Sequence, residues 1–232
     1  MLEFQDVTRS FQLDADTTIT PVHSVNLKIE PGEFVVIVGR SGSGKTTLLN
    51  LAAGLIKPSA GHVMIDDVDL TVMSDRELSS LRARKMGFIF QFPSLLSALT
   101  IKDNVSLPVI FTRGYEPRDV SSRAARLLKA LGLGDKLDVY PKQLSAGEQK
   151  RVVIARSLIN EPQLVLADEP TSELDKRTEK EVLNILRDIN SRGVTFLVAT
   201  HNLDLIKVAT RAFEMEDGNL NQVTEATSVL GA

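Results

Sequence analysis

Eight consecutive residues carry types and spacings suited to phosphoryl-transfer chemistry. The segment Gly39–Thr46 reads Gly-Arg-Ser-Gly-Ser-Gly-Lys-Thr and satisfies the spacing G-x-x-x-x-G-K-[ST]. Its glycines allow successive backbone N–H groups to turn inward around a polyphosphate, while Lys45 adds a charge and Thr46 a hydroxyl for Mg²⁺. We expect Lys45 to be an exposed loop residue. The candidate phosphate-binding residues are Gly39, Arg40, Ser41, Gly42, Ser43, Gly44, Lys45, Thr46 and Thr47.

Two elements must hold this loop in place. The apolar run Phe34–Val38 predicts a buried strand before it, and Thr46–Ala53 predicts a helix after it, with its positive end towards the phosphates. An ordinary glycine-rich turn that caps a helix is the structural alternative. The match at eight positions, in the required strand and helix context, favours the nucleotide site.

A second apolar run ends in two adjacent carboxylates. Leu164–Ala167 predicts a short buried strand, and Asp168, Glu169 and the strand-stopping Pro170 follow it. Asp168 is our candidate partner for Mg²⁺, directly or through water, and Glu169 is our candidate base for the attacking water. A surface acidic turn is the alternative, and the phosphate loop upstream makes it the weaker one.

The segment Leu144–Gln149 reads Leu-Ser-Ala-Gly-Glu-Gln and narrows the class of NTPase. Ser145 followed three residues later by Glu148 is a capping box that opens an amphipathic helix. A capping box has a purely structural role. The same helix end also offers N–H groups to an anion, and we expect both roles to apply.

In these blocks and their order, the sequence resembles the ATP-binding subunit of ABC (ATP-binding cassette) transporters, from about Leu2 to Leu220. The family signature reads Leu-Ser-Gly-Gly-Gln or Leu-Ser-Gly-Gly-Glu. The resemblance implies an ATP-dependent head-to-tail homodimer with ATP and Mg²⁺ as cofactors. It also implies that Ser145, Gly147 and Glu148, at the start of the signature helix, contact the γ-phosphate of the ATP held by the other subunit.

Two further segments match family positions that act on the reaction. Gly87–Gln91 resembles the strand that ends in the glutamine loop, which implies that Gln91 contacts Mg²⁺ or the attacking water and senses the membrane partner. Thr195–His201 resembles the strand that presents a switch histidine to the γ-phosphate. Taken alone, a single glutamine or histidine would more often be structural.

The remaining matches are less specific. Phe11 falls where the family carries an aromatic residue that stacks on adenine, and core packing is an equally good explanation of it. Asp175 belongs to a loop that crosses the dimer interface, or is only a helix N-cap. The sequence departs from the family in two places. Ala146 replaces the first signature glycine, and Ser172-Glu173 replaces a common Gly-Asn.

The overall composition excludes several other classes of protein. The chain has 232 residues, 43% of them hydrophobic, with a net charge of −3 and no cysteine. It therefore has no thiolate metal site and no basic surface expected to bind nucleic acid. No apolar stretch reaches bilayer length, so we expect a cytosolic chain. A chromosome or repair ATPase would carry a coiled coil or a basic face.

The predicted fold is an α/β P-loop NTPase (RecA-like) core with an antiparallel β subdomain and an inserted α-helical signature subdomain. Alternating strands before residues 31–32 and 66–67 indicate the antiparallel part, and the pattern between 91 and 144 is helical, with Asp119 as an expected N-cap. The expected organisation is one domain over 2–232, with a core lobe of about 1–90 and 160–232 and a helical subdomain of about 91–159.

Four segments are similar to the lipoprotein-release and macrolide-export branch of the family. They are Asp75–Leu78, Gly87–Phe92, Leu166–Thr171 and Phe213–Gly218. The resemblance implies a separate transmembrane permease, which would place the chain on the cytoplasmic face of the inner membrane. We expect the permease near Gln91 and Phe92–Leu107, where Leu95, Leu96 and Leu99 either receive a partner helix or pack internally. An ATP-gated regulator of a cell-envelope or cell-division complex would share every motif.

Overall fold

The computed structural model of the chain describes residues 1–14, 16–112 and 117–223. The chain divides into two compact units, which are described separately below. Unit 1 consists of Met1–Leu78 together with the chain from Thr195 onward, and unit 2 consists of Ser79–Val194.

Unit 1 contains an antiparallel sheet in the order β2-β1-β4-β5. Its strands are β1 (Leu2–Gln12), β2 (Thr18–Ile29), β4 (Ala60–Ile65) and β5 (Val68–Asp69). On β1, Phe4 pairs with Leu27 on one side and with Val63 on the other, and all three side chains are buried. This confirms the antiparallel strands that the alternating pattern predicted.

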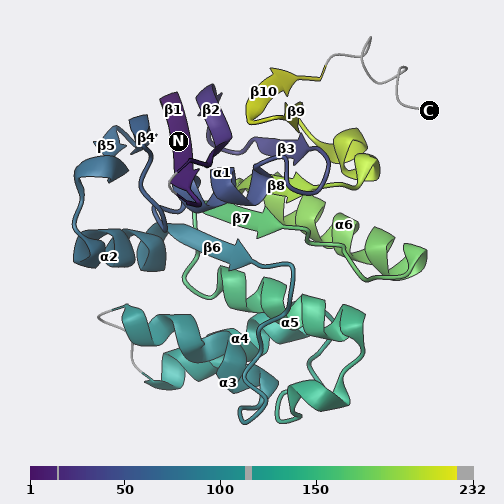
Figure 1. Cartoon of the computed structure of the whole chain (residues 1–232). Helices are drawn as coiled ribbons and strands as arrows, with labels where there is room; N and C mark the ends of the chain where they lie inside the picture. The colour runs from purple at the N-terminus through teal and green to yellow at the C-terminus, as the bar shows by residue number, and fades with distance from the viewer. Residues whose placement is uncertain (15, 113–116, 224–232) are drawn as a thin grey trace. The chain divides into compact units, whose positions relative to one another are not determined.

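The second sheet of unit 1 joins strands that are far apart in the sequence. The strands are β3 (Phe34–Val38), β8 (Thr195–Thr200), β9 (Arg211–Glu216) and β10 (Asn219–Gln222), in the order β10-β9-β3-β8. β3 is parallel to both β8 and β9, and every residue of β3 and β8 is buried. Asp217 and Gly218, both with positive φ, form the predicted turn between β9 and β10 (Figure 1).

Helix α1 (Lys45–Ala52) of unit 1 contacts β8 and β2. It begins one residue earlier than the sequence predicted. Leu48 and Leu51 are fully or almost fully buried on its inner face, so packing fixes the helix that follows the phosphate loop. Two 3-10 helices, η1 (Leu70–Val72) and η4 (Leu203–Val208), complete this unit.

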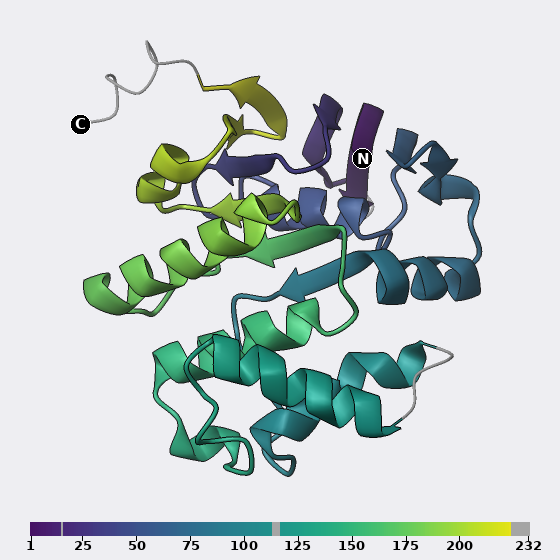
Figure 2. The same cartoon turned by 180° about the vertical axis from the view of Figure 1, so that it is seen from behind.

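Unit 2 combines two parallel strands with helices. The strands are β6 (Met86–Ile89) and β7 (Leu164–Asp168). The helices are α2 (Asp75–Lys85), in which the unit boundary falls, α3 (Ile101–Ser106), η2 (Leu107–Phe111), α4 (Pro117–Ala130), η3 (Pro141–Gln143), α5 (Ala146–Leu158) and α6 (Lys176–Ser191). Figures 1 and 2 show α3, α4 and α5 packed against one another. Ile101, Leu128 and Val152 lie in the buried core that joins them.

Most local predictions in unit 2 are confirmed, and one is wrong. Helix α4 begins at Pro117, so Asp119 lies in its first turn and is not the N-cap. Proline is well suited to the first helical position because its missing N–H needs no partner there. The predicted boundaries near residues 90 and 160 remain a prediction. Within the described ranges, no helix has the length and apolar character that a membrane span requires.

Candidate functional site

The phosphate loop of unit 1 runs against the backbone of two strands. A Cβ atom on Gly44 would overlap the carbonyl oxygen of Pro21 on β2, and one on Gly39 would overlap the carbonyl oxygen of Met215 on β9. Gly42 lies in open space and is needed for its φ of +81 alone. Glycine is therefore required at three positions for two different reasons, close approach and backbone conformation.

Lys45 lies across the loop. Its Nζ donates hydrogen bonds of 2.8 Å to the carbonyl oxygens of Gly39 and Arg40. The side chain is only 7% exposed, so the expectation of an exposed lysine was wrong. The two hydrogen bonds turn the side chain back onto the backbone of its own loop and away from solvent. Ser43 Oγ is also buried and has no hydrogen-bond partner among the described residues, and a phosphate oxygen would satisfy it.

The start of α1 is open to an anion. Gly44 is its N-cap and provides no side-chain hydrogen bond, and the first turn holds no acidic residue. No carboxylate of the helix's own first turn therefore offsets its N–H groups and positive end. Thr46 is exposed and Thr47 half-buried in this first turn, and their roles at the phosphates and Mg²⁺ remain predictions.

Phe11 is half-buried near the end of β1 and stacks against a cation. The guanidinium carbon of Arg9 lies 4.3 Å from the centre of the Phe11 ring, and Arg9 Nη1 donates to the carbonyl oxygen of Lys57 over 3.0 Å. Arg9 thus covers one face of the ring and holds its orientation. An adenine would have to use the opposite face. This geometry is compatible with both explanations of Phe11, so its adenine role remains a prediction.

His201 follows β8 directly and is exposed at the carboxyl end of that strand. The turn after it is fixed by side chains: the N–H of Asn202 donates to Thr200 Oγ1, and Asn202 Oδ1 accepts from the N–H of Asp204, both over 3.0 Å. The predicted position of the histidine at a strand end is confirmed. Its contact with a γ-phosphate remains a prediction.

Glu169, in unit 2, has an unusual backbone conformation. It follows Asp168 at the end of β7 and has φ +47, in the left-handed region that non-glycine residues rarely occupy. The N–H and Oγ of Ser172 both donate to the carbonyl oxygen of Glu169, over 3.2 and 3.0 Å, and stabilise the turn. Such strain concentrates at functional positions because it aims a side chain that a regular strand would direct elsewhere. Both carboxylates are half-buried.

The signature block forms the predicted capping box at the start of α5. Ser145 Oγ accepts from the N–H of Glu148 over 3.3 Å, and Glu148 Oε2 accepts from the N–H of Ser145 over 2.9 Å. Ser145 and Ala146 are exposed, whereas Gly147 is buried. A Cβ on Gly147 would overlap Cγ2 of Thr178 on α6, so this glycine has a packing role within its own chain.

Glu148 also forms an ion pair. Its Oε1 lies 2.5 Å from Nζ of Lys136, in the turn between α4 and η3. The hydrogen bond from Lys136, followed by that from the backbone of Ser145, lowers the pKa of Glu148 from 4.5 to about 2. The first turn of the signature helix therefore carries an ionised carboxylate, held by a lysine.

Helix α5 holds the glutamine loop by two cations. Lys150, 2% exposed, donates from Nζ to the carbonyl oxygen of Gln91 over 3.0 Å. One helical turn and a half later, the Arg156 guanidinium donates to the carbonyl oxygens of Ser94 and Pro93, over 2.8 and 2.9 Å. Burial lowers the pKa of Lys150, and the carboxylates of Glu173 and then Glu169 oppose that shift. Within unit 2, Lys150 thus joins the signature helix to the glutamine loop by a hydrogen bond and interacts with the candidate base Glu169 through charge.

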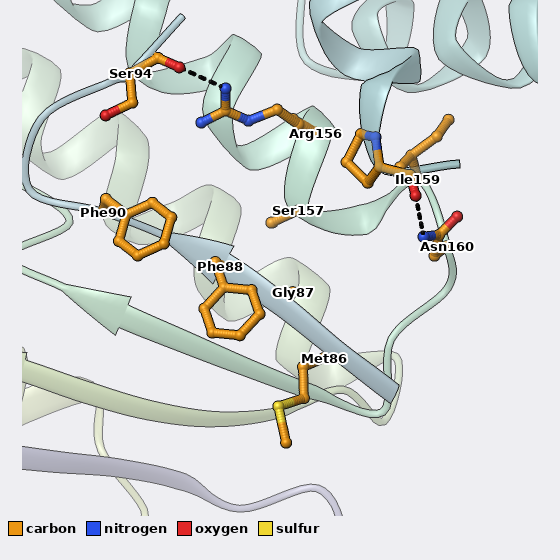
Figure 3. A pocket seen from close by; sticks show the side chains of 10 residues that line it. Met86, Gly87, Phe88, Phe90, Ser94, Arg156, Ser157, Ile159 and Asn160 are labelled. Atoms are coloured by element: carbon orange, nitrogen blue, oxygen red, sulfur yellow. Dashed lines mark hydrogen bonds between the residues drawn. The ribbon is translucent and has the colours of Figure 1, made fainter. Parts of the chain in front are cut away.

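Next to this loop lies a hollow of about 280 Å³. Phe88 and Phe90 line it with parallel rings 5.7 Å apart, and Figure 3 shows both rings on the same side of β6. Arg156 and Asn160 contribute polar groups at its edge. The remaining lining residues are Met86, Gly87, Ser94, Pro108, Ser157 and Ile159. Apolar walls with a few polar groups are typical of a recognition site.

The apolar residues after the glutamine loop fall into two groups: some are exposed, as partner binding would require, and others pack internally. Phe92 is 61% exposed and Leu96 is 52% exposed, whereas Leu95 packs against the helical core. Leu99 is half-buried.

On the other side of Glu169, Asp175 is the N-cap of α6, as the structural alternative predicted, and Glu173 has φ +64. Asn adopts such a left-handed backbone more readily than most residues do, so the Asn common at this family position would fit it.

Sequence reasoning missed several residues that contact the named ones, all of them distant in the chain except Arg9, which lies two positions from Phe11. They are Arg9 under Phe11, Lys136 on Glu148, Thr178 against Gly147, and Lys150 and Arg156 on the glutamine loop. Only Lys150 left a signal in the sequence, because a lysine among the buried positions of an amphipathic helix is unusual. The contacts of the others depend on tertiary structure.

Comparison with known proteins identifies the family. The family model for "ABC transporter" matches residues 22–172, more than half of the chain. The macrolide export ATP-binding/permease protein MacB of Marinobacter nauticus is 43% identical over 97% of the chain, which spans 35% of that protein. An ABC transporter ATP-binding protein of Thermotoga maritima is 39% identical over the whole chain and 98% of its own length.

The fold also matches solved structures. A dimeric structure of a post-hydrolysis state of the ATP-binding cassette MJ0796, bound to ADP and Pi, superposes with a TM-score of 0.88 at 37% identity. The match covers 97% of this chain and 99% of that one. A second dimeric structure of MJ0796, described as a bacterial ABC transporter cassette, gives a TM-score of 0.87. The chain spans about a third of the MacB relatives and almost all of each cassette.

Proposed function

Since the chain belongs to the ABC transporter family and is its ATP-binding, ATP-hydrolysing cassette, we propose that it powers a membrane permease by ATP-driven closure of a head-to-tail homodimer. The permease is a separate protein, as the near full-length match to the Thermotoga cassette supports. The process is export or lipoprotein release by mechanical coupling, and the chain acts at the cytoplasmic face of the inner membrane. The MacB relatives are named for macrolide export.

The exposed signature is the observation that carries this proposal. Ser145 and Ala146 are exposed at the start of α5. Ser145 Oγ accepts from the N–H of Glu148, and its hydroxyl also interacts with the Glu148 carboxylate, an exposed contact that it can exchange for an external acceptor. A helix N-terminus with such an exposed hydroxyl suits the γ-phosphate of an ATP held by the other subunit. Ala146 adds a methyl group beside this contact, which does not remove the donors.

We assign the roles at the nucleotide from the family positions that these residues match. The phosphate loop with Lys45 holds the β- and γ-phosphates, and Phe11 stacks on adenine. Glu169 accepts a proton from the attacking water, and its left-handed backbone fixes the direction of the carboxylate. His201 and Gln91 contact the γ-phosphate and the water, respectively. Together they act as the electrostatic and positioning groups that phosphoryl transfer requires.

Mg²⁺ is the implied metal ion, and the residues fit it. Thr46, Asp168 and Gln91 provide one hydroxyl, one carboxylate and one amide oxygen, directly or through water. Mg²⁺ prefers such a sparse oxygen set completed by phosphate oxygens and water. In the described part of the chain, no group of three or more His, Cys, Asp and Glu residues forms a cage for a metal. The ion would neutralise charge on the phosphates.

A mixture of two inactive variants tests the shared site. Lys45→Ala loses the charge for phosphate binding and Ser145→Arg blocks the signature, so each homodimer should be inactive. A heterodimer combines one intact loop with one intact signature. With Glu169→Gln added to both chains, Mg-ATP should produce the heterodimer on gel filtration. If only the otherwise unmodified Glu169→Gln chain dimerises, the trans role is wrong and the capping box alone explains Ser145.

The hollow in Figure 3 is our candidate binding site for the permease. Phe90 lines it and Phe92 follows on the exposed loop, so an apolar segment of the permease can enter beside the glutamine loop. Lys150 and Arg156 join this loop to α5, which gives the permease a direct mechanical connection to the signature helix.

Recovery of the permease from membranes tests this binding site. Tagged wild-type chain should retain a multi-spanning membrane protein from detergent-solubilised membranes, as mass spectrometry would identify. Phe92→Asp should lose it because a charge replaces an apolar contact. Val72→Asp, at an exposed apolar position of unit 1, is the matched control. Equal recovery with Phe92→Asp and the control would exclude this binding site.

A further inference from the structure

The signature helix of this chain carries a negative charge where the proposed function requires an anion to bind. Glu148 is the third residue of α5, and its Oε2 accepts from the N–H of Ser145 over 2.9 Å. The carboxylate thus lies at the same helix end as the hydroxyl of Ser145. An ionised carboxylate repels a nearby phosphate and offsets the positive end of the helix.

Lys136 is placed to cancel this charge. Its Nζ lies 2.5 Å from Oε1 of Glu148, so the two carboxylate oxygens have different partners, the lysine and the backbone of Ser145. The Glu148 side chain is 17% exposed and that of Lys136 is 36% exposed. A pair with this limited exposure is screened less by salt than two surface charges would be.

The backbone around Lys136 is fixed. The N–H of Lys136 donates to the carbonyl oxygen of Leu133 over 3.2 Å, and its own carbonyl oxygen accepts from Val139 over 3.1 Å. Leu133 is buried in the helical core, and Leu137 and Val139 pack against that core. The lysine therefore reaches the signature from an anchored turn and not from a flexible loop.

We infer that Lys136 is a positioning residue for dimer closure: it holds and neutralises Glu148, so that the start of α5 can accept the γ-phosphate of the partner subunit's ATP. The inference rests on the proposed trans role of Ser145 and Gly147. Binding of the partner subunit's γ-phosphate would then also require Lys136, a residue outside the signature block. A neutral residue at position 148 would make the lysine dispensable, and this separates the charge effect from a structural one.

The test measures the ATP concentration that gives half-maximal dimer in a Glu169→Gln background, by analytical ultracentrifugation with Mg²⁺. Lys136→Met should raise this concentration about tenfold, because it leaves Glu148 as an uncompensated anion. Adding Glu148→Gln to Lys136→Met should return it to within about twofold of the parent. Lys136→Arg should stay close to the parent, because it keeps the charge.

Two controls accompany this series. Lys102→Met removes another lysine of unit 2, whose Nζ pairs with Asp138 over 2.9 Å, and should leave closure unchanged. Affinity of the monomer for ATP, measured by fluorescence of a labelled nucleotide, should be the same in all variants. Raising salt should reduce the Lys136→Met defect, because screening weakens repulsion between Glu148 and phosphate. A packing defect would not respond in this way.

The outcomes separate the two ideas. If the Glu169→Gln parent remains monomeric with saturating Mg-ATP, the proposed trans site and this inference both fail. If the parent dimerises and Lys136→Met matches it, Lys136 has no role in closure. The inference is also overturned if the Lys136→Met defect persists after Glu148→Gln is added, since neutralising the carboxylate should remove it.

Discussion

Gly147 of the signature and Thr178 of α6 are in such close contact that a Cβ atom on the glycine would overlap the Cγ2 methyl group of the threonine. Thr178 cannot easily withdraw, because its Oγ1 donates to Asp175 Oδ2 over 2.7 Å as part of the N-cap of α6. Gly147 therefore has two duties, one in packing α5 on α6 and one in the proposed contact with phosphate.

Gly147→Ala should lower the free energy of unfolding by about 1–3 kcal/mol, as overpacking of a buried contact usually does. Thr178→Ser removes the methyl group and keeps the hydroxyl that caps α6. The double variant should recover most of the stability in a urea titration. If ATP-dependent dimerisation in the Glu169→Gln background remains weak in the double variant, Gly147 contributes to phosphate binding independently of its packing on Thr178. A single variant as stable as wild type would contradict the contact.

Phe11→Leu distinguishes adenine stacking from core packing. Stacking of a base on an aromatic ring contributes about 1–3 kcal/mol, so the KM for ATP should rise on the order of tenfold. Phe11→Tyr keeps the ring face and should change KM by less than about twofold. Measurement of stability alongside KM decides the matter. Loss of stability with unchanged KM would leave Phe11 as a packing residue stacked on Arg9.

Glu169→Gln should keep ATP binding and reduce hydrolysis on the order of 10²- to 10⁴-fold, the range for loss of a positioned general base. A gel-filtration species of twice the monomer mass should then accumulate with Mg-ATP. Glu161→Gln is a matched control, because Glu161 is another glutamate of unit 2 with a positive φ, and it is exposed. Similar losses of hydrolysis in both variants would argue against a specific role for Glu169.

The stability of the signature helix should depend on acid pH through Glu148. Folding lowers the pKa of this carboxyl from 4.5 to about 2. Its contribution is therefore complete above pH 4.5 and is lost as the pH falls towards 2. Glu148→Gln has no such titration. The difference in free energy of unfolding between wild type and Glu148→Gln should shrink over this window, and a constant difference would show that the ion pair does not act in the fold.

Local features of the fold could be predicted because neighbouring residues determine them. The runs Phe34–Val38 and Leu164–Ala167 are buried strands, and the Ser145 and Glu148 capping box is present. The start of α4 was misplaced because Asp119 is a good capping residue by type, while Pro117 is a good first residue by geometry. Both signals are local, and only the structure shows which one prevails.

Features of the site that depend on exact backbone geometry, or on residues distant in the chain, could not be predicted. The burial of Lys45 follows from the hydrogen bonds that turn it back onto its own loop, and the left-handed backbone of Glu169 follows from the turn after β7. Neither has a pattern in the sequence. The cations of α5 that hold the glutamine loop come from more than fifty positions away along the chain. No spacing in the sequence groups such residues, because only folding brings them together.

The arrangement of β3 between β8 and β9 also constrains how the protein is made. On a ribosome, Phe34–Val38 emerges early, yet its hydrogen-bonding neighbours are the strands that contain Phe196 and Phe213. The loop glycine Gly39 meets Met215 on the later of these strands. A nascent chain therefore cannot complete its phosphate loop until the segment through Met215 has been translated. Until then β3 presents an apolar strand with open edges, a species that chaperones would be expected to bind and on which ATP can have no stabilising effect.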